Sequence, residues 1–285
     1  MPCALCDDTG WKPVDDPSGV RRVVRCECWR ERVGQSRLAD ARIPKRYLHC
    51  TLANFADYNE SLTRAAGQAR RVAEGFPVVS RGLLLEGPPG VGKTHLAVAV
   101  LKHVIEGSGA RGLFYDTRDL LRVIRSTYDP SIRTTELEVL RPVLTADLLV
   151  LDDLGAEKTS EWVEETMNLI VNTRYNERRT TMFTSNYLDI PDDSDPNSLL
   201  FRIGFRMRSR LHEMCEFIEM DGADYRELPV NGGVDDLIAL WKMRAGKKPL
   251  PAPRGTGRQA RAQLREPAAR DGKADLKWPG GRAGS

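Results

Sequence analysis

One eight-residue run carries the clearest chemistry in this sequence. Residues 87–94 read Gly-Pro-Pro-Gly-Val-Gly-Lys-Thr, which follows the pattern G-x-x-x-x-G-K-[ST] of a loop that binds the phosphates of a nucleoside triphosphate. Its glycines let backbone N–H groups approach an anion closely. In such a loop the Lys93 ammonium reaches the β- and γ-phosphates, and the Thr94 hydroxyl binds Mg²⁺. The residues expected to bind the nucleotide are Gly87, Pro88, Pro89, Gly90, Val91, Gly92, Lys93, Thr94 and His95.

Two carboxylates follow a second apolar run. Residues 148–151 read Leu-Leu-Val-Leu, which is typical of a buried parallel strand, and Asp152 and Asp153 come directly after them. Ligands of open α/β sheets bind at this C-terminal end of the strands. Alone, two such acids would indicate a solvated loop. Behind a phosphate-binding loop, they predict Asp152 as a ligand of Mg²⁺ and Asp153 as the general base for an attacking water.

A third polar residue follows another strand. The strand at 181–184 runs into Ser185 and Asn186. An amide in this place can contact the γ-phosphate or align the water, and an ordinary asparagine in a turn fits the sequence equally well. Asn186 is therefore a candidate catalytic residue whose role the sequence leaves open.

Four of the six cysteines lie within the first thirty residues. They form a C-x-x-C pair, Cys3 and Cys6, and a C-x-C pair, Cys26 and Cys28. In a chain without signs of secretion, paired cysteines favour a metal over disulfides, and four thiolates predict a structural Zn²⁺ site. The short C-x-C spacing leaves open that His49 or Cys50 replaces one ligand. Free thiols are the simpler alternative, although so small a segment needs a cross-link to fold.

The elements that must position these residues alternate between strands and helices, which predicts a mostly parallel sheet covered on both faces. The expected strands are 82–86, 112–115, 148–152, 181–184 and 216–220. The expected helices are 61–74, 94–106, 117–128, 135–144, 160–178 and 202–214. The charged segment 29–42 is spaced loosely like one face of a further helix.

Composition divides the chain into three parts: a cysteine module and linker at 1–42, a core at 43–230, and a short helix followed by a basic tail at 231–285. Residues 246–285 hold ten Lys or Arg against three Asp or Glu, and they have few large apolar residues, so we expect disorder there. No apolar run approaches the roughly 18 residues of a membrane helix, and no signal peptide is evident. The sequence therefore predicts a cytoplasmic protein without a membrane partner.

Taken together, these motifs resemble the AAA+ ATPases of the bacterial helicase-loader group, the DnaC/DnaI type, whose relatives include the IstB-type transposition helpers. The resemblance covers about residues 43–228. The matching segments are Ile43–Tyr47, Thr51–Phe55, Gly87–Thr94, Gly112–Tyr115, Leu149–Gly155, Thr184–Asn186 and Asp221–Arg226. It implies a three-layer P-loop core that binds ATP with Mg²⁺.

The resemblance also implies roles for single residues. Tyr47 and Phe55 would lie near the adenine, Asn186 would be the first sensor, and Arg226 would be a second sensor. The helix 202–214 is rich in arginine. Arginines on an exposed helix usually lie in solvent, but in an oligomeric ATPase one such arginine commonly completes the site of the neighbouring subunit. Arg210 is the candidate for this arginine finger, with Arg206 as the alternative. The family's single-stranded DNA path would correspond to about residues 117–135, with Arg118, Arg122, Arg125 and Arg133.

Two departures from the family pattern affect the expected activity. Asp153 stands where most AAA+ proteins have Glu, and the shorter carboxylate favours slow, DNA-stimulated hydrolysis. Little sequence after Arg226 could form the usual helical lid, so the site would depend more on self-association with a neighbouring subunit.

The cysteine module decides between the two related functions. The resemblance implies that a zinc module engages the replicative helicase, so the expected function is a helicase loader that binds ATP, single-stranded DNA and that helicase. The alternative is a transposition helper that binds duplex DNA and a transposase.

Overall fold

The computed structural model describes residues 3–15, 20–157, 160–229 and 232–245. Its main sheet consists of β3 (Gly82–Glu86), β4 (Gly112–Asp116), β5 (Leu148–Asp152), β6 (Thr180–Ser185) and β7 (Cys215–Glu219). Neighbouring strands are all parallel, in the order β4-β5-β6-β3-β7. Strands that are adjacent in the chain are not always adjacent in this sheet, so helices must connect them across its faces.

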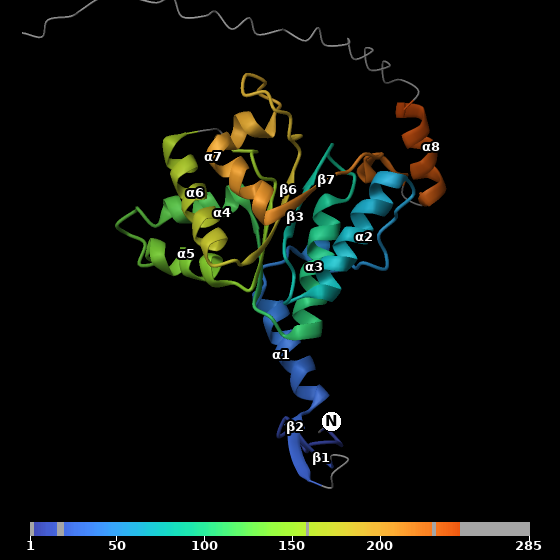
Figure 1. Ribbon diagram of the computed structural model, residues 1–285, viewed down its shortest axis with the longest axis vertical. Helices are drawn as coiled ribbons and strands as arrows, with labels where there is room; N and C mark the ends of the chain where they lie inside the picture. The colour runs from blue at the N-terminus through green and yellow to red at the C-terminus, as the bar shows by residue number, and fades with distance from the viewer. Residues whose placement is uncertain (1–2, 16–19, 158–159, 230–231, 246–285) are drawn as a thin grey trace, which may run out of the picture. The chain divides into compact units, whose positions relative to one another are not determined.

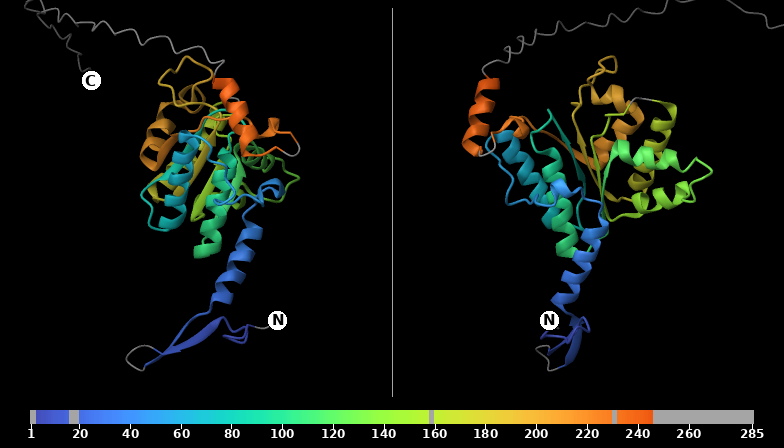
Figure 2. Two further views of the ribbon diagram at one scale, coloured as in Figure 1. Left: turned by 90° about the vertical axis from the view of Figure 1, so that its right-hand side faces the viewer. Right: turned by 180° about the vertical axis from the view of Figure 1, so that it is seen from behind.

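Two groups of helices cover the two faces of the sheet (Figures 1 and 2). The helices are α2 (Glu60–Gly75) and α3 (Lys93–Ser108) on one face, and α4 (Thr117–Ser126), α5 (Glu136–Thr145), α6 (Glu161–Asn176) and α7 (Leu199–Met214) on the other. Leu83 and Leu85 of β3 belong to the core beneath α2 and α3, whereas Leu84 belongs to the opposite core. Burial on both faces explains why β3 is apolar without interruption. The predicted three-layer α/β fold is confirmed.

The order of the strands brings the predicted site together. β6 lies between β3 and β5, so the carboxyl ends of three neighbouring strands meet at one edge. Glu86 pairs with Ser185, and Asp116 of β4 pairs with Asp152 of β5. The residues that follow these strands therefore lie beside one another although they are far apart in the sequence.

Side-chain caps start two of the helices on the second face, and a glycine interrupts a third. The Asp116 side chain accepts hydrogen bonds from the backbone N–H groups of Arg118 and Asp119, which caps α4. Thr135 and Glu138 form a reciprocal capping box at the start of α5. α7 begins earlier than predicted and contains a kink at Gly204, where φ is 74°. A glycine adopts this left-handed conformation without the steric cost of a Cβ.

A small antiparallel sheet precedes the core and was not predicted. It consists of β1 (Trp11–Asp15) and β2 (Arg21–Arg25), and α1 (Glu27–Asp40) follows it. α1 packs against α3, where a Cβ on Gly34 would lie 3.5 Å from the Cα of Glu106. Just after α1, the Ala41 carbonyl accepts a hydrogen bond from the N–H of Phe114, at 2.8 Å. This contact satisfies one backbone group on the edge strand β4.

A buried arginine joins the α6 layer to the sheet. Arg174 is completely buried, and it donates to the Thr181 hydroxyl and to the carbonyl groups of Val143, Ala146 and Thr180, at distances of 2.7 to 3.0 Å. Burial lowers the pKa of its guanidinium to about 9, so the side chain stays charged at neutral pH. These bonds fix the C-terminal end of α6 over β6.

The last described element is α8 (Val234–Ala245), which agrees with the short helix expected after the core. The basic tail predicted to be disordered, residues 246–285, lies outside the described residues. Within the described parts of the chain, no helix combines the length and apolarity that a membrane crossing requires.

Candidate functional site

The loop at residues 87–94 joins β3 to α3, and two of its glycines lie against other backbone. A Cβ on Gly87 would come within 2.0 Å of the Met220 carbonyl oxygen, and one on Gly90 would come within 1.7 Å of Asp224 Oδ1. Both glycines have positive φ, at 141° and 79°. Larger residues would displace the loop, so its glycines are required by packing as well as by conformation. α3 begins at Lys93, where its N-terminal end can attract an anion.

Lys93 is buried at the centre of this site. Its Nζ donates to the carbonyl oxygens of Gly87 and Pro88 and to Asn186 Oδ1, each at 2.8 Å. Burial lowers the pKa of Lys93 to about 8, and the nearby charges of Asp152 and Asp153 oppose this change. The ammonium therefore remains mostly charged at neutral pH, and it is held by neutral oxygens that phosphate oxygens could replace.

Asp152 lies beside the first helical turn of α3. Its Oδ1 accepts hydrogen bonds from the Thr94 hydroxyl at 2.9 Å and from the Thr184 hydroxyl at 2.6 Å. Burial raises the pKa of this carboxyl, and the two hydroxyl groups partly offset the rise. The carboxylate and the Thr94 hydroxyl are the hard oxygen donors that Mg²⁺ prefers, so these two residues fit a magnesium site.

Asp153 has a different environment from Asp152. Its backbone adopts a positive φ of 59°, and its N–H donates to the Thr184 hydroxyl at 2.9 Å. Its Oδ1 accepts from Asn186 Nδ2 at 2.6 Å, and its Oδ2 lies 3.1 Å from Arg118 Nη2. This carboxylate is thus partly exposed and aimed by two partners, an arrangement suited to a general base.

Asn186 joins the two halves of the site. Its amide oxygen accepts from Lys93 while its amide nitrogen donates to Asp153. The sequence left this residue undecided between a turn and a site residue. The structure brings it within hydrogen-bond distance of both side chains, so a change at the phosphate loop can reach the candidate base through one amide.

A pocket of about 750 Å³ surrounds these groups. Besides the phosphate loop and the acidic residues, its walls include Tyr47, His49, Cys50, Phe55, Tyr58, Arg118, Tyr225, Arg226 and Leu237. The predicted adenine residues Tyr47 and Phe55 and the candidate second sensor Arg226 therefore lie at the same pocket as Lys93. Arg206 and Arg210 of α7 are not among its lining residues, which is what a residue acting on a neighbour's site requires.

His95 lies on the side of the pocket that faces the N-terminal segment. Its Nε2 is 3.0 Å from the Thr51 carbonyl oxygen, and its ring meets that of Phe55 edge-on with centroids 5.5 Å apart. Burial lowers its pKa. The histidine thus fastens the segment that carries Phe55 to the start of α3.

Some residues at the site carried no signal for this role in the sequence. The Thr184 hydroxyl forms hydrogen bonds with the Asp152 carboxylate and with the backbone N–H of Asp153. Threonine is common in strands, so its position in the sequence did not indicate this role. Arg118 was expected on a DNA path, and its ion pair with Asp153 depends on how β4 lies next to β5. Leu237 reaches the pocket from α8.

One buried carboxyl group lies outside the phosphate site, at the end of β3. Glu86, the last residue of β3, is 8% exposed, and its Oε2 accepts from the N–H of Asp189 at 2.8 Å. Asp189 in turn forms an ion pair with Arg208 of α7, through Nη2 at 2.8 Å, and contacts His212 Nε2 at 2.9 Å. Burial raises the pKa of Glu86 to about 7, with further contributions from Asp189 and Glu219.

We expect Glu86→Gln to change how stability depends on pH. Between pH of about 4.5 and 7, the folded protein keeps a proton on Glu86 that the unfolded chain releases, so wild-type stability falls as pH rises, by about 3 kcal/mol at most. The glutamine variant cannot release this proton, so its free energy of unfolding lacks this fall. In urea unfolding, the free energy of unfolding of the variant should therefore rise relative to that of the wild type from pH 5 to pH 8. Glu106→Gln, at an exposed position of α3, is the control, and an equal gain there would contradict the assignment.

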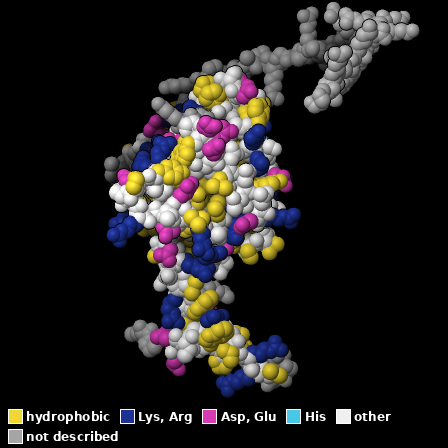
Figure 3. All heavy atoms as spheres, turned by 90° about the vertical axis from the view of Figure 1, so that its left-hand side faces the viewer, with side chains coloured by type: hydrophobic (Ala, Val, Ile, Leu, Met, Phe, Trp, Pro, Cys, Tyr) yellow, Lys and Arg dark blue, Asp and Glu magenta, His cyan; other side chains and the backbone are white. Residues whose placement is uncertain are grey.

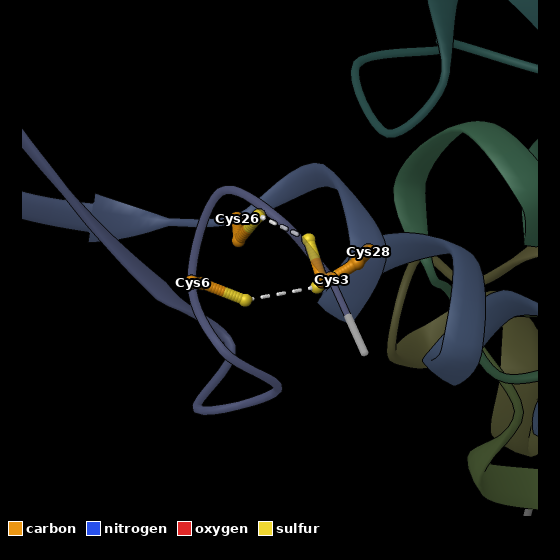
Figure 4. Close-up of side chains that lie close together, drawn as sticks. All are labelled: Cys3, Cys6, Cys26 and Cys28. Carbon is orange, nitrogen blue, oxygen red and sulfur yellow. Dashed lines mark hydrogen bonds between the residues drawn. The ribbon is translucent and has the colours of Figure 1, made fainter. Parts of the chain in front are cut away.

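The four N-terminal cysteines converge on one point (Figure 4). The Sγ atoms of Cys3 and Cys26 are 3.8 Å apart, those of Cys6 and Cys28 are 3.2 Å apart, and all four lie within 4.8 Å of one another. Four sulfurs at about 2.3 Å from a tetrahedral Zn²⁺ would be separated by about 3.8 Å. The cysteines therefore fit a closed zinc site. His49 and Cys50, the alternative ligands, line the nucleotide pocket instead.

Zinc content provides a direct check of this site. Cys26→Ser is expected to lower the bound zinc from about one ion per chain to near zero, because a closed site of four thiolates loses a ligand. Inductively coupled plasma mass spectrometry of purified protein measures this ratio. Cys50→Ser should keep its zinc, since that buried thiol lies outside the cluster. Equal zinc contents in the two variants would contradict the four-cysteine assignment.

The strand order and the phosphate site define the class of this protein as an AAA+ P-loop protein. A family model described as IstB-like ATP binding protein matches residues 27–227, and the chain belongs to this family. The resemblance found in the sequence is thereby confirmed.

Similar proteins include members of the helicase-loader group. The replicative helicase loader DnaC of Buchnera aphidicola subsp. Schizaphis graminum is 28% identical over 144 residues, and that of Escherichia coli K12 is 29% identical over 143. Each match covers 50% of this chain and 58% of the relative, so the chain spans less than two thirds of either protein.

Solved structures give the same grouping. A crystal structure of the DnaC helicase loader is 37% identical, with a TM-score of 0.56 over 62% of this chain and all of that one. A crystal structure of DnaI is 26% identical, with a TM-score of 0.52 over 64% of this chain and 94% of that one.

Proposed function

We propose that this protein is an ATP-dependent loader of a replicative helicase. The observation that carries the proposal is the bridge by which Asn186 links Lys93 to Asp153, beside a pocket large enough for a nucleotide. The similarity to DnaC helicase loaders supports the replication role. Residues 43–230 would be the ATPase core, residues 1–42 the zinc module and linker, and residues 231–285 a helix and tail. The setting would be the cytoplasm, where the helicase acts.

The site residues divide the work of hydrolysis. The phosphate loop and Lys93 would hold the triphosphate, while Thr94 and Asp152 would hold Mg²⁺, which neutralises phosphate charge. Asp153 would take a proton from the attacking water, and Asn186 would orient it. The ion pair with Arg118 holds the Asp153 carboxylate in place, and the short side chain of Asp153 favours slow turnover. Slow turnover suits a switch that changes state once per loading event.

Single-stranded DNA would bind along α4. Arg122 and Arg125 are exposed on this helix, and Arg125 lies over the ring of Trp162, 4.5 Å from its centroid. The rings of Trp162 and Tyr128 meet edge-on with centroids 6.3 Å apart, and Tyr128 is 53% exposed. Arginines beside exposed aromatic rings are suited to contact phosphates and stack bases. Arg118, at the start of the same helix, pairs with Asp153, so DNA bound there could alter the candidate base.

Arg210 is proposed as the finger that completes a neighbour's site. Arg208 is held by Asp189, and Arg210 Nη1 donates to the Arg206 carbonyl oxygen on the outer part of α7. Arg210→Ala is expected to leave ATP affinity of the monomer unchanged and to lower DNA-stimulated turnover by at least about 100-fold, because the transition-state charge loses a cation. Calorimetry and a phosphate-release assay measure the two quantities.

Arg202→Ala is the matched control for this prediction, since Arg202 belongs to the same helix as Arg210 and its guanidinium lies over the ring of Tyr187. Its stimulated turnover should stay near the wild-type value. Normal stimulated turnover in Arg210→Ala would contradict the finger assignment and direct the same test to Arg206.

The zinc module would hold the helicase. Apolar side chains on its two strands are exposed, including Trp11 at 44% and Val23 at 64%. Figure 3 shows hydrophobic and basic side chains side by side on this module. Such a mixed surface is suited to binding another protein.

Native mass spectrometry tests the loader proposal. We would mix the chain with the replicative helicase of the same organism, with and without ATP and single-stranded DNA. A stoichiometric complex that Cys26→Ser abolishes is the expected result. The absence of a complex in every nucleotide state would contradict the proposal.

A second candidate function follows from the family model that matches the chain, which is described as IstB-like. In this case the protein would be a transposition helper that binds duplex DNA and a transposase. Competition between single-stranded and duplex DNA of equal length discriminates the two functions, because a loader should prefer the single strand and a transposition helper the duplex.

A further inference from the structure

The nucleotide pocket has a polar end and an apolar wall. Lys93, Asp152 and Asp153 are grouped at the phosphate loop by their hydrogen bonds to Asn186, Thr94 and Thr184. Another part of the wall is apolar or aromatic and includes Phe55, Ala56, Tyr58 and Leu237, although polar residues such as Arg46 and Asn54 also line the pocket. A nucleotide has an anionic phosphate chain and a flat base, so phosphates at the loop leave the base for the apolar wall.

Leu237 is the part of this wall that comes from α8. It is 3% exposed, although Val234, Asp235, Asp236 and Ala239 of the same helix are exposed and Ile238 is half-buried. Trp241 lies four residues further on and therefore shares the face of Leu237. α8 thus turns Leu237 toward the pocket, whereas Ile238, Leu240 and Trp241 are half-buried and the charged residues of the helix are exposed.

Two contacts hold α8 in this place. The ring of Trp241 meets that of Tyr58 edge-on, with centroids 6.4 Å apart, and the Tyr58 hydroxyl accepts from the N–H of Ala223 at 2.7 Å. Arg244 Nη2 lies 2.7 Å from Glu227 Oε1. Tyr58 also lines the pocket, so the helix is fastened to the pocket wall itself.

We propose that α8 forms one wall of the base-binding subsite, with Leu237 in contact with the base and Trp241 as the residue that positions the helix. The inference rests on the proposed binding of ATP at the phosphate loop. It differs from the expectation, drawn from the sequence, that little of the chain after Arg226 could form the usual helical lid. The base end of the site is then completed within one chain, and a neighbouring subunit is needed at the phosphate end.

Comparison of ATP with inorganic triphosphate tests this assignment, because triphosphate carries the phosphates without a base. Leu237→Ala is expected to weaken ATP binding about tenfold, since most of a buried apolar contact is lost, and to leave triphosphate binding unchanged. Trp241→Ala should cause the same selective loss, which Trp241→Phe should largely restore. Met243→Ala, at a position of α8 that is 58% exposed, is the control and should change neither affinity.

The outcomes separate the subsite from the proposed function. Wild-type ATP affinity in Leu237→Ala would overturn the inference. An equal loss of ATP and triphosphate affinity would also overturn it, because Leu237 would then act through the phosphate loop. If the wild-type chain bound neither compound, the proposed ATP binding itself would be contradicted.

Discussion

Lys93→Ala is expected to weaken ATP binding by at least about 100-fold. The Lys93 ammonium is buried and donates to two loop carbonyls and to Asn186, all of them neutral acceptors. Phosphate oxygens would replace these neutral acceptors with anionic ones, which adds the attraction between opposite charges to each hydrogen bond. Removal of the cation takes away this gain and leaves the triphosphate charge opposite Asp152 and Asp153. Calorimetric titration with ATP and Mg²⁺ measures the loss.

A surface lysine provides the control for this change. Lys45 is exposed and does not line the nucleotide pocket, so Lys45→Ala should bind ATP as the wild type does. Circular dichroism of both variants would show whether the fold is retained. Comparable ATP affinity in Lys93→Ala and the wild type would contradict the assignment of the phosphate loop.

Asp153→Asn is expected to separate binding from hydrolysis. ATP affinity should stay within about threefold of the wild type, while turnover should fall by roughly 100- to 10,000-fold, the range that general acid–base catalysis typically contributes. The amide has nearly the same shape as the carboxylate, and its one oxygen can accept from Asn186 or from Arg118, but it cannot take the proton from water. Phosphate release under saturating ATP is the measurement.

Asp153→Glu distinguishes chemistry from packing at the same position. A glutamate keeps the carboxylate and lengthens its reach, so turnover should equal or exceed the wild-type value. If Asp153→Asn hydrolysed ATP at the wild-type rate, Asp153 would not be the base. If Asp153→Glu were as inactive as Asp153→Asn, the position would be sensitive to shape rather than to the carboxylate.

The main sheet was predictable because its strands are buried on both faces. β3 and β5 are largely apolar runs, β5 ends in Asp152 of the site, and the loop after β3 has a spacing that few other structures share. The order of the strands follows from the fold class that these motifs define. Lys93, Asp152 and Asp153 were therefore expected at one edge of the sheet before any contact was known, whereas the role of Asn186 was left open and Thr184 was not singled out.

Other features depend on tertiary contacts or lack a periodic pattern. β1 and β2 are largely exposed on both sides, and β1 contains Pro13, so no alternation marked them as strands. The kink at Gly204 divides a helix that reads as continuous in the sequence. The pairing of Arg118 with Asp153 joins residues 35 positions apart, and it follows only once β4 and β5 are adjacent.

The position of α8 shows the same limit. Its apolar residues indicated a short helix, but a helix pattern does not say which surface it covers. The contact of Trp241 with Tyr58 and the ion pair of Arg244 with Glu227 determine that position, and neither pair has a recognisable spacing.

The most direct test of the helicase-loader account is loading onto closed circular single-stranded DNA. The chain, the replicative helicase of the same organism and ATP would be incubated with the circle, and DNA-bound helicase would be separated by gel filtration at high salt. We expect helicase to remain on the circle with the wild-type chain, and to be absent with Lys93→Ala or without the chain. Equal retention of helicase with and without the chain would contradict the account.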